Sequence, residues 1–331
     1  MILKFGPWRY ALWLCLIAFP AACGQSHDAE RLMALSEKAE HDGQLTVAAD
    51  LAHQAARRKP HDFGTQYGAA LLELQAGHFN EAEEPLRKAI VLRPNFGPAH
   101  LNLGAVLMHK GDRAAGREAF LKALQLDPHL TRASFNLGLL EFDEGHLSAA
   151  ETQFRRALAT DPTHQASYVW LGKLYVRQQQ FDEALQVLRQ VLALDPNDPE
   201  PFFDLGVAYH GLGKLDQAIA AFRRVVELNP AYARAQYNLG TLLLRAMDYE
   251  AALQPLGEAI RLDPQSSDAF YNLAATYACL EEKENALQHL ARAIVLKPAL
   301  ASTAQRDPDF QSLHADPEFV ALTQQRRSKE P

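Results

Sequence analysis

Residues 131–164 read TRASFNLGLLEFDEGHLSAAETQFRRALATDPTH, and this stretch decides the fold. Alanine, leucine and phenylalanine recur in it at helical spacing on both sides of Gly145, and the pair Asp161-Pro162 closes it. Glycine is the usual left-handed residue after a helix, and the residue before a proline is pushed out of the α region. The stretch therefore predicts two α-helices joined by a short turn.

The same pattern repeats along the chain with a constant period. Pro162 is one of eight prolines that are each 34 residues from the next: Pro60, Pro94, Pro128, Pro162, Pro196, Pro230, Pro264 and Pro298. The spacing divides the chain, without any insertion, into eight units: 29–62, 63–96, 97–130, 131–164, 165–198, 199–232, 233–266 and 267–300.

Small residues recur at the eighth position of each unit. A glycine inside a helix costs ~1 kcal/mol relative to alanine, so repeated helical glycines need a packing reason. Large apolar residues such as Phe120 and Phe154 recur at the twenty-fourth position, and we expect them to pack on the small ones. Ser148 and Asp216, three residues after the turn glycine, are of the type that caps the second helix. The eighth-position residues are Ser36, Ala70, Gly104, Gly138, Gly172, Gly206, Gly240 and Ala274.

The unit that contains Ser134-Phe135-Asn136-Leu137-Gly138, Ala150, Phe154, Ala157 and Asp161-Pro162 resembles a tetratricopeptide repeat. The resemblance covers residues 29–300. It implies an all-α protein, a right-handed α-solenoid of eight helix-turn-helix repeats that each contact only their neighbours. Residues 301–331 break the register, and Asp307-Pro308 and Asp316-Pro317 resemble helix starts. We therefore expect C-terminal capping helices followed by a tail.

The first 22 residues are predicted to be a signal peptide. Residues 10–19 form an uncharged apolar run after a basic start, shorter than the ~20 residues that span a bilayer. Ala21-Ala22-Cys23-Gly24 resembles the lipobox of bacterial lipoproteins, which implies that Cys23 is acylated and becomes the mature N-terminus, before a short linker over 23–28. Pro20 replaces the usual aliphatic residue, so cleavage after Ala22 without lipidation, or an uncleaved anchor, are alternatives.

Composition excludes several classes of function. The chain has 331 residues, 48% of them hydrophobic, and a formal net charge of −7. A folded core is therefore expected, and the acidic excess argues against a nucleic-acid partner. The cysteines Cys15, Cys23 and Cys279 are too far apart for a disulfide framework or a cysteine metal site. No catalytic constellation, metal motif or phosphate loop stands out, so we expect no enzymatic activity, cofactor or small-molecule substrate.

The resemblance also implies a concave groove, lined by the first helix of each repeat, that binds extended or helical segments of other proteins. Apolar residues at the fifth position, asparagines at the sixth and a basic cluster would contact such a segment, which could carry an acidic group. Alternatively, these residues pack the helices and pair with Asp143, Glu200 and Asp204. The groove candidates are Asn102, Arg132, Phe135, Asn136, Val169, Lys173, Arg177, Phe203, Arg234, Tyr237, Asn238, Arg245 and Asn272.

These features predict a non-catalytic scaffold that is exported to the periplasm of a Gram-negative bacterium and tethered by lipid to the outer membrane. Its layout is similar to that of repeat lipoproteins that assist the assembly of envelope complexes, which is an analogy at the level of the fold. The alternative is an accessory subunit that presents a substrate protein to a separate enzyme, as in periplasmic cytochrome maturation.

Overall fold

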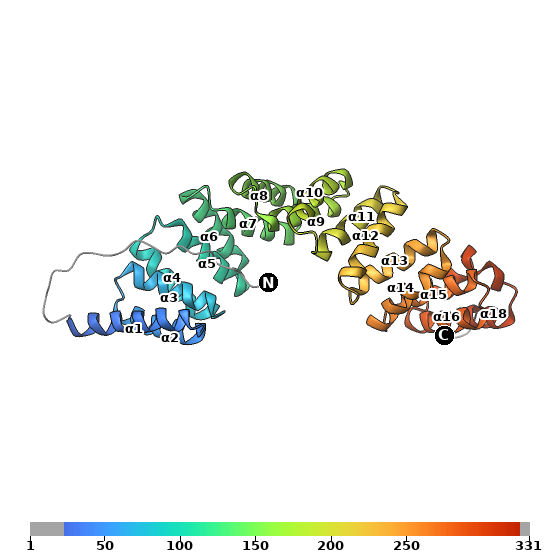
Figure 1. The fold of residues 1–331 in the computed structure, drawn as a ribbon, viewed down its shortest axis with the longest axis horizontal. Coiled ribbons are helices and arrows are strands. Elements are labelled where there is room, and N and C mark those ends of the chain that lie inside the picture. Colours follow the sequence, from blue (N-terminus) through green and yellow to red (C-terminus); the bar gives the residue numbers. More distant parts are fainter. Residues whose placement is uncertain (1–22, 325–331) are drawn as a thin grey trace, which may run out of the picture. The chain divides into compact units, whose positions relative to one another are not determined.

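The computed structural model describes residues 23–324 as a succession of helices, and this range contains no β-strand (Figure 1). The predicted signal peptide, 1–22, and residues 325–331 lie outside the described residues. The first helices of the eight repeats are α1 (Cys23–His41), α3 (Phe63–Gln75), α5 (Gly97–His109), α7 (Thr131–Asp143), α9 (Gln165–Arg177), α11 (Pro199–Gly211), α13 (Ala233–Arg245) and α15 (Ser267–Cys279).

The second helices alternate with them in chain order. They are α2 (Leu45–Arg58), α4 (Phe79–Leu92), α6 (Arg113–Leu126), α8 (Leu147–Thr160), α10 (Phe181–Leu194), α12 (Leu215–Leu228), α14 (Tyr249–Leu262) and α16 (Lys283–Leu296). Contacts join the two helices of a repeat, and then the second helix to the first helix of the next repeat, as in α9, α10 and α11. This order is that of an α-solenoid, as the period predicts. The chain divides after Leu137, within α7, into two compact units that are described separately.

The small residues of the eighth position lie where the two helices of a hairpin approach closely. A Cβ atom added to Gly172 would lie 2.6 Å from Leu188 Cδ2, and one added to Gly240 would lie 2.5 Å from Leu256 Cγ. Real Cβ atoms do not come so close to their neighbours. The glycines therefore offset their helix-propensity cost by allowing the large residue of the twenty-fourth position to pack against the helix backbone.

The ends of the second helices agree with the sequence in one respect and differ in another. Asp127 and Asp161, each before a proline, have extended backbone dihedral angles and end α6 and α8. Ser148 and Asp216, however, are not capping residues, because α8 and α12 begin at Leu147 and Leu215. The helix begins two residues after the left-handed turn residue, so these polar side chains lie in its first turn. There the negative charge of Asp216 interacts favourably with the helix dipole.

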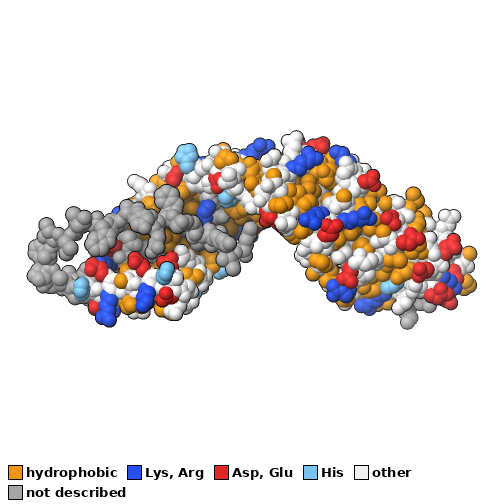
Figure 2. All heavy atoms as spheres, viewed as in Figure 1, with side chains coloured by type: hydrophobic (Ala, Val, Ile, Leu, Met, Phe, Trp, Pro, Cys, Tyr) orange, Lys and Arg blue, Asp and Glu red, His pale blue; other side chains and the backbone are white. Residues whose placement is uncertain are grey.

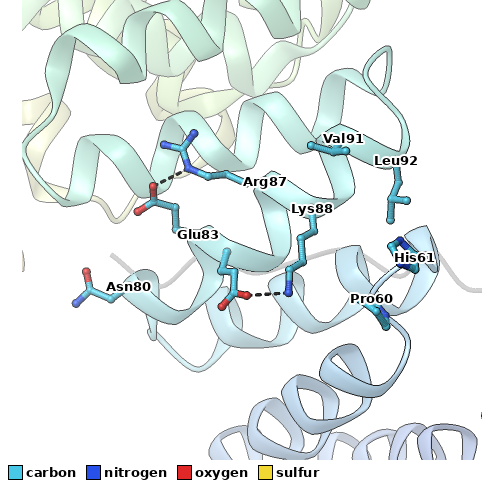
Figure 3. Close-up of a pocket in the computed structure, with 9 residues that line it drawn as sticks. Pro60, His61, Asn80, Glu83, Arg87, Lys88, Val91 and Leu92 are labelled. Carbon is cyan, nitrogen blue, oxygen red and sulfur yellow. Dashed lines mark hydrogen bonds and ion pairs between the residues drawn. The ribbon is translucent and has the colours of Figure 1, made fainter. Parts of the chain in front are cut away.

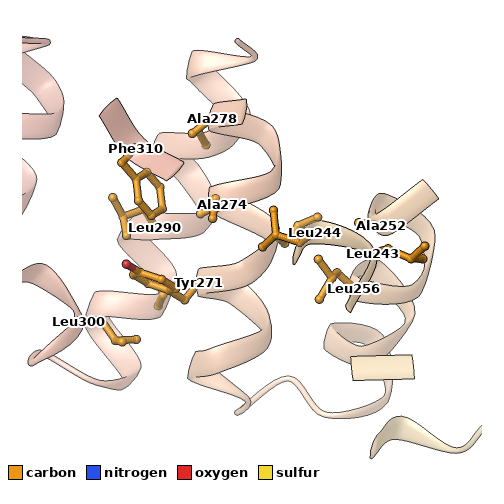
Figure 4. Packing of buried hydrophobic residues seen from close by; sticks show 14 of the residues in the cluster. Leu243, Leu244, Ala252, Leu256, Tyr271, Ala274, Ala278, Leu290, Leu300 and Phe310 are labelled. Atoms are coloured by element: carbon orange, nitrogen blue, oxygen red, sulfur yellow. The ribbon is translucent and has the colours of Figure 1, made fainter. Parts of the chain in front are cut away.

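The last repeat is covered by three short elements, as expected for residues after 300. They are α17 (Leu300–Ala304), the 3₁₀ helix η1 (Pro308–Leu313) and α18 (Pro317–Gln324). Phe310 of η1 is fully buried and lies 5.4 Å from the ring of Tyr271 in α15. Figure 4 shows Phe310 beside Leu290 and Tyr271, at the end of an apolar cluster that continues to Leu243 and Leu256.

The start of α1 corrects one expectation. Residues 23–28 were expected to form a linker, but α1 begins at Cys23, so this segment is helical. The first helix of the first repeat, which begins at Ala29, therefore extends back over these six residues. Among the described helices, none is both long and apolar enough to cross a membrane.

Candidate functional site

In the first compact unit, the sixth-position asparagine of α5 is engaged inside the protein. Asn102 Nδ2 donates to Tyr67 Oη of the preceding repeat at 3.0 Å, and Asn102 is 7% exposed. Burial raises the pKa of Tyr67 to about 12, while Arg132 acts in the opposite direction. Phe135 and Asn136 of α7 are half-buried. Asn102 therefore stabilises the contact between two repeats, in agreement with the alternative that these residues pack the helices.

The same interaction recurs between the last two repeats of the second unit. Asn272 Nδ2 donates to Thr241 Oγ1 at 2.8 Å and to Tyr237 Oη at 3.5 Å. In both places the sixth-position asparagine meets the fifth-position tyrosine of the preceding repeat. The asparagines were expected to bind a partner backbone, but the side-chain donors of Asn102 and Asn272 are used for this contact.

Asp204 and Asn238 occupy the sixth position in α11 and α13, where this interaction is missing. The fifth-position residues that precede them are Val169 and Phe203, and neither carries a hydroxyl group. Asp204 is 8% exposed, and its Oδ2 has no hydrogen-bond partner among the described residues. Burial raises the pKa of Asp204 to about 7, although Lys173 lowers it. From the sequence, Asp204 was expected only to form ion pairs, but the replacement of a fifth-position tyrosine by Val169 already indicates that a hydroxyl partner is missing.

Charged groups from three neighbouring first helices surround Asp204. Lys173 Nζ of α9 donates to Glu200 Oε2 of α11 at 2.8 Å, and Tyr232 Oη donates to Glu200 Oε1 at 2.9 Å. Burial raises the pKa of Glu200, but these two hydrogen bonds outweigh it and hold the pKa below its usual value. Tyr232, just before α13, was not among the sequence candidates. We call Lys173, Glu200, Asp204, Tyr232 and Arg234 the α9–α11–α13 cluster.

Phe203 was expected to contact a partner, and its position in the structure corrects this. Its side chain is 5% exposed. The ring of Tyr232 stacks on it with centroids 5.1 Å apart, and the guanidinium of Arg234 lies 4.9 Å from the ring centroid. Phe203 therefore forms the base on which Arg234 rests. Among the described residues, Arg234 makes no hydrogen bond or ion pair, so its donors face solvent.

The other basic candidates in the second unit are held by neighbouring repeats. Arg177 lies 5.0 Å from the ring centroid of Phe142 and donates to the Phe142 carbonyl oxygen at 3.2 Å. Arg245 Nη1 lies 2.7 Å from His210 Nε2. Both arginines are exposed, and Val169 is half-buried. Figure 2 shows acidic and basic side chains interleaved with hydrophobic ones over this part of the chain, in keeping with local pairing of charges.

One group of side chains has atoms close enough for a metal ion. Ligand atoms of Glu141, Glu144 and His146 all lie within 4.8 Å of one another. His146 Nδ1 lies 2.9 Å from Glu141 Oε2, and at the same positions two repeats earlier His78 Nδ1 lies 2.9 Å from Glu73 Oε2. Because the pair recurs, we interpret it as a structural link between the end of a first helix and the turn.

A pocket on the second-helix side of the first unit was not foreseen from the sequence. It has a volume of about 530 Å³ and lies between α4 and the turn before α3 (Figure 3). Its wall includes two ion pairs, Glu83–Arg87 at 2.8 Å and Glu84–Lys88 at 2.7 Å. Val91 at its edge is 78% exposed. Hydrogen bonds from Lys110 and Arg87 lower the pKa of Glu83, and a hydrogen bond from Lys88 lowers that of Glu84, so both carboxylates are held ionised as partners of these cations.

Comparisons with known proteins agree with the repeat architecture. A family model described as "TPR repeat" matches residues 172–213, and one described as "Tetratricopeptide repeat" matches residues 67–130, 203–267 and 241–301. Among curated proteins, no match was found. Among solved structures, YrrB, described as a TPR protein with an unusual peptide-binding site, is 28% identical with a TM-score of 0.52, and the match covers 58% of this chain and 100% of YrrB.

Two further solved structures share less than 25% sequence identity with this chain, so their similarity concerns the fold alone. The C-terminal part of a TPR repeat-containing protein from Cytophaga hutchinsonii is 17% identical, with a TM-score of 0.58 over 70% of this chain and 95% of that one. PilF of Pseudomonas aeruginosa is 21% identical, with a TM-score of 0.55 over 67% of this chain and 98% of that one.

Proposed function

Because the chain belongs to the tetratricopeptide repeat family, we propose that it is a non-catalytic scaffold that binds segments of partner proteins along its first helices. The family fold suggests protein partners. A solenoid of this kind exposes a continuous row of helices, and this row offers many similar positions to an extended or helical segment.

The observation that carries the proposal is the difference between equivalent positions. Asn102 and Asn272 use their side chains for contacts between repeats, whereas the buried Oδ2 of Asp204 has no hydrogen-bond partner among the described residues. An unpaired buried polar atom costs ~1–3 kcal/mol, which a partner can return on binding. The peptide-binding site named in the description of YrrB, a 28% identical protein, supports the same reading.

We test the site by capture of partners from detergent-solubilised membranes with the full chain. Reversal of the charge at Arg234 together with removal of the amide, Arg234→Glu with Asn238→Ala, is expected to abolish capture of the specific partner. The matched control is Arg223→Glu, on the second helix α12 and exposed, which is expected to capture normally. If both variants capture like the wild type, the partner binds elsewhere and the assignment of the first helices is wrong.

Export and anchoring are the second part of the proposal. We infer that the chain is a periplasmic lipoprotein of the outer membrane, acylated at Cys23, on the basis of the lipobox-like sequence 21–24. A lipoprotein-type cysteine carries two acyl chains, and stable anchoring takes two. Mass spectrometry is expected to find acylated Cys23, and Cys23→Ser is expected to release the protein from membranes. An unmodified N-terminus at Cys23 or Gly24 would contradict this.

The identity of the captured partner separates the two processes under consideration. Components of an envelope complex would support a role in its assembly. Enzymes such as those of cytochrome maturation would support the alternative of an accessory subunit that presents a substrate protein.

A further inference from the structure

The polar gap at Asp204 has a specific cause in the repeat pattern. At two other steps of the solenoid, a tyrosine hydroxyl accepts from the next asparagine, Asn102 at 3.0 Å and Asn272 at 3.5 Å. At α11 the pattern changes at both members, because valine stands in place of tyrosine and Asp204 in place of asparagine. The buried Oδ2 of Asp204 is thus left without a partner at a position that elsewhere closes the repeat interface.

Two cations lie near Asp204 together with the carboxylates of Glu200 and Asp198, and the cations can donate hydrogen bonds to a ligand. Lys173 has an ammonium with one bond to Glu200, and Arg234 has a guanidinium with no hydrogen bond among the described residues. Asn238, four residues after Arg234 and hence on the same face of α13, adds an amide group. A ligand that satisfies several such donors at once is an acceptor, and a carboxylate is the acceptor that these cations favour.

The protonation of Asp204 decides the charge that such a ligand meets. Lys173 on α9, Arg234 on α13, and Glu200 and Asp198 at the start of α11 act on Asp204, and the Tyr232 hydroxyl lies on Glu200. Asp198 accepts from the backbone N–H of Glu200 at 3.0 Å. With Asp204 neutral, its hydroxyl is one more donor. With Asp204 ionised, its carboxylate and that of Glu200 both face the ligand.

We propose that Asp204 makes binding at the α9–α11–α13 cluster depend on pH: protonated, it donates to a side-chain carboxylate of an acidic partner segment held by Lys173 and Arg234, and ionised, it repels that carboxylate. The inference rests on the proposed function, since it assumes that a segment lies along the first helices. The segment covers a carboxyl group that is already poorly hydrated, so binding takes up a proton, and affinity falls as the pH rises.

The burial of Asp204 places the transition in the neutral range. Because burial raises its pKa to about 7, the group changes charge between pH 6 and pH 8. Glutamate side chains of a peptide have a pKa of about 4.3 and stay ionised throughout this range. The ligand therefore does not change its charge, and a pH effect on affinity comes from the protein.

The experiment uses the full chain and a fluorescein-labelled peptide, Gly-Glu-Glu-Glu-Glu-Gly with a C-terminal amide, in fluorescence-polarisation titrations at pH 6 and pH 8. Wild-type affinity is expected to be at least about fivefold weaker at pH 8. Asp204→Asn keeps a neutral donor and is expected to bind at both pH values as the wild type binds at pH 6, within about twofold. Asparagine occupies the same position in four other repeats, so this variant fits the fold.

Controls separate this effect from other titrations. The chain has 13 histidines, and any contribution they make to the pH dependence of binding persists in Asp204→Asn. The matched control is Asp248→Asn, which removes an exposed carboxylate and is expected to show the pH dependence of the wild type. The proposal is overturned if wild-type affinity does not depend on pH, if Asp204→Asn keeps the dependence, or if the corresponding lysine peptide binds as tightly. Tighter binding only of a peptide with a free C-terminus would also overturn it. The proposed function is tested separately by partner capture. If the variant Arg234→Glu with Asn238→Ala still abolishes capture, the proposed function stands even though the pH proposal has failed.

Discussion

At the residue scale, the fifteenth position of every repeat requires a left-handed backbone. Glycine occupies it in five repeats, for example Gly111 with φ of 84°. Gln179, Met247 and Glu281 adopt φ of 60° at the same position. A side chain in this region costs about 1–2 kcal/mol, because Cβ approaches the following carbonyl oxygen. The turn is therefore set by the hairpin geometry, and the three non-glycine residues are tolerated there at the expense of stability.

Met247→Gly is expected to stabilise the protein. The substitution relieves the strain of the left-handed backbone, but the greater freedom of glycine in the unfolded chain cancels part of this gain. The free energy of unfolding is therefore expected to rise by about 0.5–1 kcal/mol. Met247 is 73% exposed, so little apolar burial is lost. Urea denaturation followed by circular dichroism measures the change. Met247→Ala removes the same side chain without relieving the strain and serves as control; an equal gain in that variant would refute the explanation.

The stability contribution of Asp204 is expected to depend on pH. Its folded pKa of about 7 lies above the ordinary value of 3.8, so the carboxyl is protonated in both states below pH 4 and costs nothing there. As the pH rises from about 4 to 7, the unfolded chain ionises first, which favours unfolding. Asp204→Asn is therefore expected to stabilise the protein at pH 8, by up to about 4 kcal/mol, and not at pH 4. Denaturation midpoints at both pH values check this, and a gain of equal size at pH 4 would contradict it.

At the scale of elements, the 34-residue period was enough to predict the helix hairpins, because each proline, turn residue and small residue acts within its own repeat. The candidate site depended on pairs from different repeats. Phe203 looked like a contact residue by its position, but Tyr232 at the end of the same repeat and Arg234 of the next repeat cover it. Asn102 was assigned to a partner, but its bond to Tyr67 could be inferred only from the stacking of α5 on α3.

The close crossing of α9 and α10 is expected to reject a large side chain. Gly172→Leu would place a Cβ 2.6 Å from Leu188 Cδ2 and further atoms beyond it, so we expect a loss of about 1–3 kcal/mol. Gly172→Leu combined with Leu188→Ala exchanges the large and small residues across the crossing. We expect the double variant to lose less than the sum of the single variants, as measured by denaturation. Strict additivity would show that the two residues do not share the space.

At the scale of the whole molecule, stability is built from contacts between neighbours. Within each compact unit, contacts join successive helices, as in α3 to α6 and α9 to α16, so a change in one repeat is felt mainly in the adjacent ones. The cap at the C-terminus therefore protects the last repeat. Tyr271 of α15 donates to Asp307 at 2.6 Å, and Phe310 packs against its ring. Without the cap, α15 and α16 would present this apolar face to water.

Deletion of residues 301–331 is expected to loosen the last repeat first. Phe310 is fully buried, and large-to-small changes at buried phenylalanines cost about 3–5 kcal/mol, so the loss of the whole cap removes at least that much protection from α15 and α16. Hydrogen exchange is expected to accelerate in these two helices. It is expected to stay near the wild-type rate in α9 and α10, which lie three repeats before the last one and lose no direct contact with the cap. A truncation after Gln324 keeps the cap elements and is the control. Uniform acceleration along α9–α16 would show instead that the second unit opens as a single cooperative body.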